Sequence, residues 1–383
     1  MSIAFIDLKK QFSVLEKEMR LAIDRVLDHA QFIMGPEVAQ LERELARYTG
    51  VKHAIGCSSG TDALLLPLMA YDVGPGDAIF TAPFTFIATA EVISFLGATP
   101  IFVDINPKTF NIDPELLEAA VTQVSREGFL RPRGIIPVDL FGLPADYDPI
   151  TTTAQEHDLF VLEDAAQAFG STYHNRQAGS LGDVGSTSFF PAKPLGCYGD
   201  GGAIFTNNDS LAEKMRSILV HGKGANKYDN VRIGLNGRLD TIQAAVLLVK
   251  LAAFPKELKE RERVASRYTQ GIKGYLETPM IPDGLTSSWA QYSVLSDHRE
   301  VLQTALKEAG IPTAIYYPKP LHLQQAFTKL GHRAGDFPIS ESVSQRVFSL
   351  PMHPYLTDEH VDLIISQILT VFENQNIGNL AGR

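Results

Sequence analysis

Short apolar runs alternate with amphipathic segments through the first half of this chain, and that alternation restricts the folds open to it. Strands that alternate with helices favour a parallel or mostly parallel α/β sheet. Ligands bind at the carboxyl ends of the strands of such sheets, so residues that follow each run are the first candidates for a site. Strands are expected at 51–57, 78–82, 100–104, 135–139, 159–163, 185–190 and 203–206, and helices at about 61–69, 86–96, 114–124 and 145–157.

The remaining segments predict two N-terminal helices and a separate α+β unit near the C-terminus. We therefore expect two domains: an N-terminal arm with a large domain (1–250), and a small C-terminal α+β domain (251–383). The helical spacing near the N-terminus is interrupted at Gly35-Pro36. Further helices are expected at 13–30, 37–48, 241–268, 299–309 and 358–373, and further strands at 285–295 and 311–317.

The composition excludes several classes of protein. The chain carries a net charge of −10, so a surface for nucleic acid is not expected. No apolar stretch approaches the roughly 18 residues that cross a bilayer, and the N-terminus lacks the features of a signal peptide. The two cysteines, Cys57 and Cys197, suggest neither a disulfide framework nor a metal site. A cytoplasmic protein without membrane, nucleic-acid or metal partners is expected.

One lysine occupies an unusual stretch. Lys193 lies close to prolines on both sides, in the apolar, glycine-rich segment 188–202 that contains no other cation. Prolines fix the backbone and glycines allow a flat ligand to approach closely. A lysine in a dry pocket can lose its proton, and the neutral amine can attack a carbonyl to form a Schiff base. The segment alone fits a surface lysine equally well.

A turn between an expected strand and an expected helix suits an anion. Ser58-Ser59-Gly60-Thr61-Asp62 points backbone amides and hydroxyls to one place, helped by the helix dipole. This arrangement fits a phosphate monoester. The alternative is an ordinary helix cap, since serine and threonine are favoured there in any case.

An acidic residue ends the apolar run at 159–163. Asp164 would be costly at the end of a buried strand without a cationic partner. A protonated pyridine nitrogen is such a partner, and the carboxylate would keep the ring an electron sink. The alternative is an aspartate that caps the next helix or pairs within the fold.

Further candidates follow the strands or lie in stiffened loops. Phe86 could stack on a ring, although aromatic residues in such places are commonly core. A glycine-containing turn before the long helix offers an amide and a guanidinium, and a proline-stiffened loop offers two phenols and an imidazole. The alternatives are a surface turn and a structural loop. These polar candidates are Asn236, Arg238, Tyr316, Tyr317 and His322.

A phosphate cradle, a stacking aromatic, a buried aspartate and a confined lysine are the parts that hold pyridoxal 5′-phosphate. With these motifs the sequence resembles the sugar aminotransferases of the DegT/StrS type, within the aspartate aminotransferase (fold type I) superfamily. The resemblance spans nearly the whole chain. Its motifs are Ser-Ser-Gly-Thr-Asp-Ala-Leu from Ser58, Glu-Asp-Ala-Ala-Gln-Ala from Glu163, Ser-Phe-Phe-Pro-Ala-Lys-Pro-Leu-Gly from Ser188, Gly-Asp-Gly-Gly-Ala from Gly199 and Gly-Leu-Asn-Gly-Arg-Leu-Asp from Gly234.

The resemblance implies a role for each matching residue. Lys193 would form the Schiff base and shuttle the proton, Asp164 would pair with the pyridine nitrogen, and Gln167 would bond the phenolic oxygen. Phe86 would stack on the ring. Asn236 would reach the phosphate in the neighbouring subunit, which implies a homodimer with shared active sites. The phosphate would be held by Gly60, Thr61 and Ser188.

The resemblance also implies the reaction. L-glutamate would give its amino group to a nucleotide-linked ketosugar in two half-reactions. The lysine segment resembles that of members acting at C3 of UDP-2-acetamido-2-deoxy-3-keto-hexuronic acids, which serve O-antigen and lipopolysaccharide biosynthesis. The substrate-binding residues would be Arg238 and His322, as partners of the sugar carboxylate, together with Tyr316 and Tyr317.

Other interpretations stay open at this point. The substrate could be a 3- or 4-keto-6-deoxyhexose linked to dTDP or UDP, or the protein could be a cofactor-binding regulator without turnover. Intact Lys193, Asp164 and Gln167 argue against the regulator. Some relatives carry histidine at the lysine position and act as dehydratases, which Lys193 argues against. Gly237 departs from the family pattern, where a larger residue is common, and is expected to widen the sugar pocket or alter how Arg238 is presented.

Overall fold

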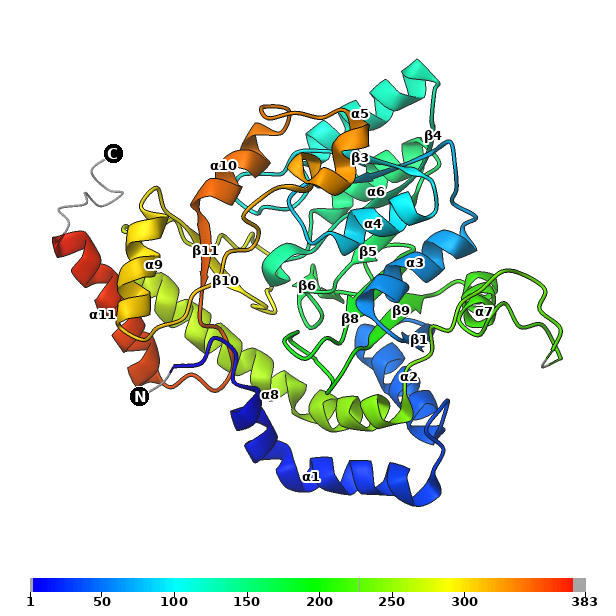
Figure 1. Cartoon of the computed structure of the whole chain (residues 1–383), viewed down its shortest axis with the longest axis horizontal. Coiled ribbons are helices and arrows are strands. Elements are labelled where there is room, and N and C mark those ends of the chain that lie inside the picture. The colour runs from blue at the N-terminus through cyan, green and yellow to red at the C-terminus, as the bar shows by residue number, and fades with distance from the viewer. Residues whose placement is uncertain (1–2, 227, 375–383) are drawn as a thin grey trace.

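The centre of the structure is a seven-stranded sheet (Figure 1). The computed structural model describes residues 3–226 and 228–374, so the outermost residues of the two expected domains, 1–2 and 375–383, lie outside it. The strands, in their order across the sheet, are β1 (His53–Cys57), β9 (Gly202–Thr206), β8 (Val184–Ser188), β5 (Phe160–Asp164), β4 (Arg131–Ile136), β2 (Asp77–Thr81) and β3 (Thr99–Phe102). β9 runs antiparallel to both neighbours and the other pairs are parallel, which confirms the mostly parallel sheet.

Helices cover both faces of this sheet. On one face lie α3 (Gly60–Ala70), α4 (Ala88–Phe95) and α7 (Asp209–Ile218); on the other lie α5 (Pro114–Glu127), α6 (Tyr147–Glu156), α2 (Pro36–Thr49) and α8 (Thr241–Ile272). Successive side chains of a strand point to opposite faces, so Ile204 of β9 packs on the first face and Phe205 on the second. Both faces are buried, as parallel α/β sheets require.

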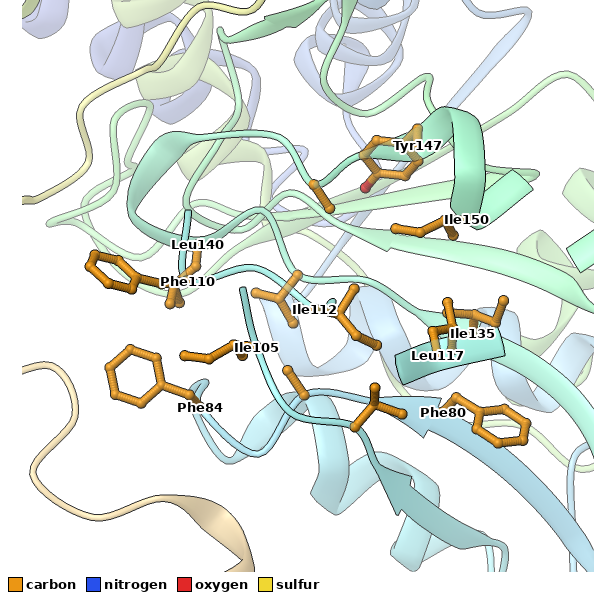
Figure 2. Packing of buried hydrophobic residues seen from close by; sticks show 14 of the residues in the cluster. Phe80, Phe84, Ile105, Phe110, Ile112, Leu117, Ile135, Leu140, Tyr147 and Ile150 are labelled. Atoms are coloured by element: carbon orange, nitrogen blue, oxygen red, sulfur yellow. The ribbon is translucent and has the colours of Figure 1, made fainter. Parts of the chain in front are cut away.

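Aromatic side chains continue the core past the carboxyl ends of β2 and β4. Phe84 and Leu140, which follow these two strands, are each 1% exposed (Figure 2). The ring of Phe84 meets those of Phe110 and Phe141 edge to face, with centroids 6.4 and 6.3 Å apart. The loops at this edge of the sheet therefore rest on a close-packed apolar base.

A second, smaller core lies away from the sheet. It contains β10 (Tyr292–Leu295), β11 (Val347–Leu350), α9 (Arg299–Glu308), α11 (Asp358–Asn374) and the end of α8. α8 joins the two cores, because Phe254 packs in the large one and Val264 in the small one. The expected division at residue 250 falls within this helix and stays a prediction. In the described part of the chain, no helix has the length and apolarity to cross a membrane.

The expected strand at 285–295 is wrong for most of its length. Only β10, its last four residues, is a strand. The backbone ahead of β10 bonds to loops of the large domain instead. The amide of Thr286 donates to the carbonyl of Thr172, and that of Ser288 donates to the carbonyl of Gly142. Tertiary partners therefore decide the conformation of this segment.

The expected strand at 311–317 is also wrong. Within this segment only Ala314 forms a β-bridge, and its partner is Ser349 of β11. The elements that were not expected from the sequence include β11, α7 and α10 (Pro338–Arg346). A local signal for α7 is present, since the side chain of Asn208 caps its first turn.

Acid should destabilise the fold through His353. This side chain is 4% exposed, and its Nε2 lies 3.2 Å from the carbonyl of Ala4. Burial, with the nearby charge of Arg261, lowers the pKa of His353 from 6.5 to about 4. Between these values the unfolded chain binds a proton that the folded chain does not, so stability falls as the pH drops from 6.5 towards 4, by roughly 3 kcal/mol.

Equilibrium denaturation at pH 7 and pH 4.5 measures this effect. We expect His353→Gln to remove much of the difference in the free energy of unfolding between pH 7 and pH 4.5. His174→Gln, at an exposed histidine, is the matched control and should keep the difference. An unchanged difference in His353→Gln would assign the acid sensitivity to other groups.

Candidate active site

The lysine predicted to react lies in a tight loop between β8 and β9. The amide of Lys193 donates to the carbonyl of Phe190 at 2.8 Å, and the amide of Cys197 donates to Phe189 at 2.8 Å, so the loop folds back on itself. The side chain of Lys193 is half-buried. Burial lowers the pKa of Lys193, while the charge of Asp164 raises it. The structure therefore brings these two predicted residues together.

Asp164 ends β5 and is 4% exposed. Its Oδ2 accepts from Thr89 Oγ1 at 2.8 Å, and its Oδ1 accepts from the amide of Ala166 at 3.2 Å. Burial raises the pKa of Asp164, and the two hydrogen bonds and the charge of Lys193 lower it. In the described part of the chain no basic side chain forms an ion pair with this carboxylate. A buried acid with neutral donors alone fits the protonated nitrogen of a pyridine ring.

Thr89 was not expected at the site. It is 1% exposed, lies in the first turn of α4, and contacts the hydroxyl of Thr85 at 3.3 Å. Thr85 lies ahead of α4, in the loop that follows β2. Thr89 and Asp164 are 75 residues apart in the sequence, so no local pattern indicates their contact.

The expected phosphate turn forms the N-terminus of α3. Ser59 caps the helix: its Oγ accepts from the amide of Asp62, and its carbonyl accepts from the amide of Ala63, each at 3.0 Å. In the described residues this leaves the amides of Gly60 and Thr61 without an acceptor. Free first-turn amides and the helix dipole form a site for an anion.

Ser188 lies against this turn although it is far away in the sequence. A Cβ added to Gly60 would lie 2.6 Å from the Cβ of Ser188 and 3.0 Å from its Oγ. Glycine is therefore required at position 60 by close approach. The predicted phosphate residues Gly60, Thr61 and Ser188 come together at the ends of β1 and β8, which run in the same direction on either side of β9.

Gly202→Ala should destabilise the same turn. A Cβ at Gly202 would lie 2.3 Å from the carbonyl oxygen of Ser59 and 2.9 Å from that of Thr187, which are both backbone atoms. Forcing such contacts apart costs roughly 1–3 kcal/mol. Gly199→Ala is the matched control, because its Cβ would meet only the end of the Gln243 side chain, at 3.0 Å. Denaturation midpoints should separate the two variants, and equal midpoints would contradict the packing argument.

Phe86 and Gln167 lie on either side of one tyrosine. The ring of Phe86 is at the surface, 55% exposed, and its centroid lies 6.3 Å from that of Tyr317. Gln167 is 4% exposed, and its Nε2 donates to the Tyr317 hydroxyl at 3.1 Å. An exposed ring face and a buried amide three residues after Asp164 fit the stacking and phenolic-oxygen roles expected of them.

The turn with Asn236 and Arg238 runs beside β1. Arg238 pairs with Cys57, and the amide of Ser58 donates to the carbonyl of Gly237 at 2.8 Å. This pairing places Arg238 next to the phosphate turn. Its Nε is buried without a hydrogen-bond partner in the described residues. Asn236 is exposed and is therefore open to another molecule.

The expectation that Gly237 widens a sugar pocket is not supported by its surroundings. A Cβ there would meet Leu235 at 2.6 Å, Leu219 at 3.3 Å and Asp62 at 3.4 Å. The position that a Cβ would take at residue 237 therefore faces packed side chains. We expect a larger residue at this position to change the path of the turn and the presentation of Arg238.

His322 is not brought to the site as the sequence suggested. Its side chain has no exposed area, and its Nε2 lies 3.0 Å from Glu341 Oε1. The ring also packs on Phe337, with centroids 4.6 Å apart. Burial lowers the pKa of His322, against the effect of Glu341. These partners keep His322 in the fold, whereas Tyr316 stays half-buried beside Tyr317.

Known proteins share both the sequence and the fold. The model of the DegT/DnrJ/EryC1/StrS aminotransferase family matches residues 13–369. A UDP-2-acetamido-2-deoxy-3-oxo-D-glucuronate aminotransferase of Pseudomonas aeruginosa is 47% identical over 367 residues, covering 96% of this chain and 99% of that one.

Solved structures agree with this match. A DegT/DnrJ/EryC1/StrS aminotransferase from Brucella abortus has a TM-score of 0.94 and 51% identity, covering 96% of this chain and 99% of that one. Ntda from Bacillus subtilis, solved with bound cofactor PMP, has a TM-score of 0.86 and 29% identity, covering 96% of this chain and 83% of that one. The fold and site define a fold type I α/β aminotransferase. The chain belongs to the DegT/DnrJ/EryC1/StrS aminotransferase family.

Proposed function

We propose that this enzyme moves the amino group of L-glutamate to C3 of UDP-2-acetamido-2-deoxy-3-keto-hexuronic acid, with pyridoxal 5′-phosphate as cofactor. The observation that carries the reaction class is the buried Asp164 close to the half-buried Lys193, at the strand ends where the anion turn lies. The Pseudomonas relative, whose name gives a 3-oxo-glucuronate substrate, supports the choice of sugar. We place the reaction in the cytoplasm and in O-antigen or lipopolysaccharide biosynthesis.

The residues of the site fit this cofactor. The amides of Gly60 and Thr61, with Ser188, would hold the phosphate, and Phe86 and Gln167 would meet the ring and its phenolic oxygen. When bound, pyridoxal phosphate supplies an electron sink that acidifies the carbon bearing the amine.

Two side chains would handle the protons of the reaction. The carboxylate of Asp164 would hold a proton on the facing ring nitrogen. The Nζ of Lys193, whose pKa burial lowers, would carry the substrate proton between the two carbon atoms as general base and acid. Phe189, Leu195 and Cys197 of the same loop pack in the apolar core beneath it.

We propose that Arg238 recognises the sugar carboxylate and that Tyr316 also contacts the sugar. The backbone of Arg238 lies beside the phosphate turn, and within the described part of the chain its buried Nε has no hydrogen-bond partner. Charge-assisted hydrogen bonds to a carboxylate are among the strong ones. Purified enzyme should be assayed with the 3-keto-uronate and with a dTDP-keto-6-deoxyhexose. We expect Arg238→Ala to lower kcat/KM for the uronate about 10- to 100-fold, because a bond to a charged group is lost, and to leave the deoxyhexose unaffected. Equal losses on both sugars would remove Arg238 from carboxylate recognition.

We propose that a second copy of the chain completes the site. Apolar side chains lie exposed around it, including Ile33 at 50% and Phe190 at 53%. Ile33 pairs with Asp240, in the same turn as the exposed Asn236. Apolar patches of this kind mark protein contacts, and Asn236 would reach the partner's cofactor phosphate.

Mixing two weakened variants tests the shared site. Lys193→Ala and Asn236→Ala are each expected to be poorly active as homodimers. If each site takes Lys193 from one chain and Asn236 from the other, mixed dimers contain one intact site, and a one-to-one mixture recovers about a quarter of wild-type activity. No recovery in dimers shown to have exchanged would mean that the sites are not shared.

A further inference from the structure

The amide group of Gln167 has a fixed orientation. Its Oε1 accepts from the backbone amide of Phe141 at 2.7 Å, and its Nε2 donates to the hydroxyl of Tyr317 at 3.1 Å. A backbone amide can only donate, so the atom facing Phe141 must be the oxygen and the atom facing Tyr317 must be the nitrogen. The two contacts therefore determine which way the NH₂ group points.

The first contact comes from a rigid turn. Phe141 has a φ of +59°, an uncommon value for a residue with a side chain. Asn111 holds the turn, because its Oδ1 accepts from the amide of Leu140 at 2.9 Å, and its Nδ2 donates to the carbonyls of Leu143 and Pro144 at 3.0 Å each. The Phe141 amide is therefore held in place for Gln167.

The second contact comes from a ring that is also confined. The Tyr317 ring packs edge to face on Phe84 and lies against Phe86, with centroids 6.2 and 6.3 Å away. Burial raises the pKa of the Tyr317 hydroxyl, so it stays a neutral phenol that can accept from Gln167. These contacts place the hydroxyl between the aromatic base of the site and the amide.

One hydrogen of the Gln167 NH₂ group is left over. An amide NH₂ has two hydrogens, and Tyr317 takes one of them. Gln167 follows Asp164 by one short turn, in which the amide of Ala168 donates to the carbonyl of Ala165 at 3.0 Å. The uncommitted hydrogen is therefore available to the ligand that Asp164 meets.

We propose that Tyr317 is a positioning residue, which holds Gln167 so that its second N–H is directed to the phenolic oxygen of pyridoxal phosphate; this rests on the proposed function. Tyr317 then acts on the cofactor through Gln167, and its hydroxyl is not primarily a ligand of the sugar. Tyr317 lies in the expected small domain (251–383), whereas the cofactor would be held by the large domain. A residue of one domain would thus affect the ionisation of the phenolic oxygen of a cofactor bound by the other.

The visible chromophore of the holoenzyme reports this contact. A hydrogen bond donated to the phenolic oxygen favours its ionised form, so that oxygen holds the proton it shares with the lysine nitrogen less tightly. Loss of the bond should raise the pH at which the chromophore titrates by about one to two units, the shift expected for a hydrogen bond to a charged group. Absorbance titration measures this pH.

A double-mutant cycle tests how Tyr317 acts. We expect Gln167→Ala to give the full upward shift, Tyr317→Phe to give a large part of it, and the double variant to shift no further than Gln167→Ala. Additive shifts would mean that Tyr317 bonds the cofactor directly through its own proton, which would overturn the proposal. Tyr275→Phe, at a tyrosine that packs on Phe372 in the small core, is the control and should leave the chromophore pH unchanged.

Three further results separate the remaining explanations. If Tyr317→Phe lowers the melting temperature but leaves the chromophore unshifted, Tyr317 is structural and the proposal is wrong. If wild-type protein supplied with pyridoxal phosphate shows no visible chromophore, the proposed function itself fails. An unchanged chromophore with a changed KM for the sugar would also overturn the proposal, because it assigns Tyr317 to the substrate.

Discussion

Lys193→Ala should lose at least about 10²- to 10⁴-fold in turnover, the contribution of a positioned general base. Lys193→Arg should be no better. A guanidinium restores a positive charge near Asp164, but it does not lose its proton at working pH, so it can neither attack a carbonyl nor accept a proton. Steady-state assays with glutamate and the ketosugar measure the loss.

Lys307→Ala is the matched control for this prediction. Lys307 is an exposed lysine on α9, away from the loop, and its removal should leave turnover unchanged. Borohydride reduction of the holoenzyme followed by peptide mapping should attach the cofactor at Lys193 alone. Attachment at another lysine, or turnover that survives in Lys193→Ala, would show that a different amine carries the reaction.

Asp164→Asn should lose almost as much activity while the fold persists. Asparagine is close in shape, and its oxygen can still accept from the amide of Ala166. The negative charge that faces the ring nitrogen is lost. Removing one partner of a buried charged pair costs roughly 3–5 kcal/mol, which corresponds to about 10²- to 10⁴-fold in rate at 1.36 kcal/mol per tenfold. Single-turnover measurement of the glutamate half-reaction isolates this step.

Thr89→Val separates charge from hydrogen bonding at the same carboxylate. It removes the 2.8 Å bond to Asp164 Oδ2 but keeps the charge, so a loss of about 2- to 12-fold is expected for one hydrogen bond of about 0.5–1.5 kcal/mol. Because that bond lowers the pKa of Asp164, the acid limb of the pH profile should move to higher pH in Thr89→Val. A loss as large as that of Asp164→Asn would mean that orientation, and not charge, is what Asp164 provides.

The sequence predicted the sheet well and the small domain poorly. The strands β2, β5 and β9 are buried at every position, and such apolar runs can be recognised without knowing their partners. In the small domain, the segment 285–291 bonds to loops more than a hundred residues away in the sequence, such as that of Thr172. No local pattern contains that information.

The residues proposed to hold the cofactor could be predicted because they lie at or just after strand ends. Asp164 and Ser188 are the last residues of β5 and β8, and the Gly60–Thr61 turn follows β1. A mostly parallel sheet brings such ends to one edge. Thr89, the Phe141 amide and the Tyr317 contact were not predictable. They depend on how α4, the turn at Phe141 and the loop that contains Tyr317 pack near the end of β5.

The antiparallel course of β9 has a consequence for the order in which this enzyme is built. Among the residues that the structure describes, β1 is joined to the rest of the sheet only through β9, so a nascent chain that ends before residue 202 lacks this neighbour of β1. The anion turn that follows β1 therefore meets Ser188 only after the ribosome has delivered β9. Such long-range pairing slows folding and exposes strand edges meanwhile. The cofactor site is thus among the last parts of the large domain to assemble, and truncations upstream of β9 should retain no binding of pyridoxal phosphate.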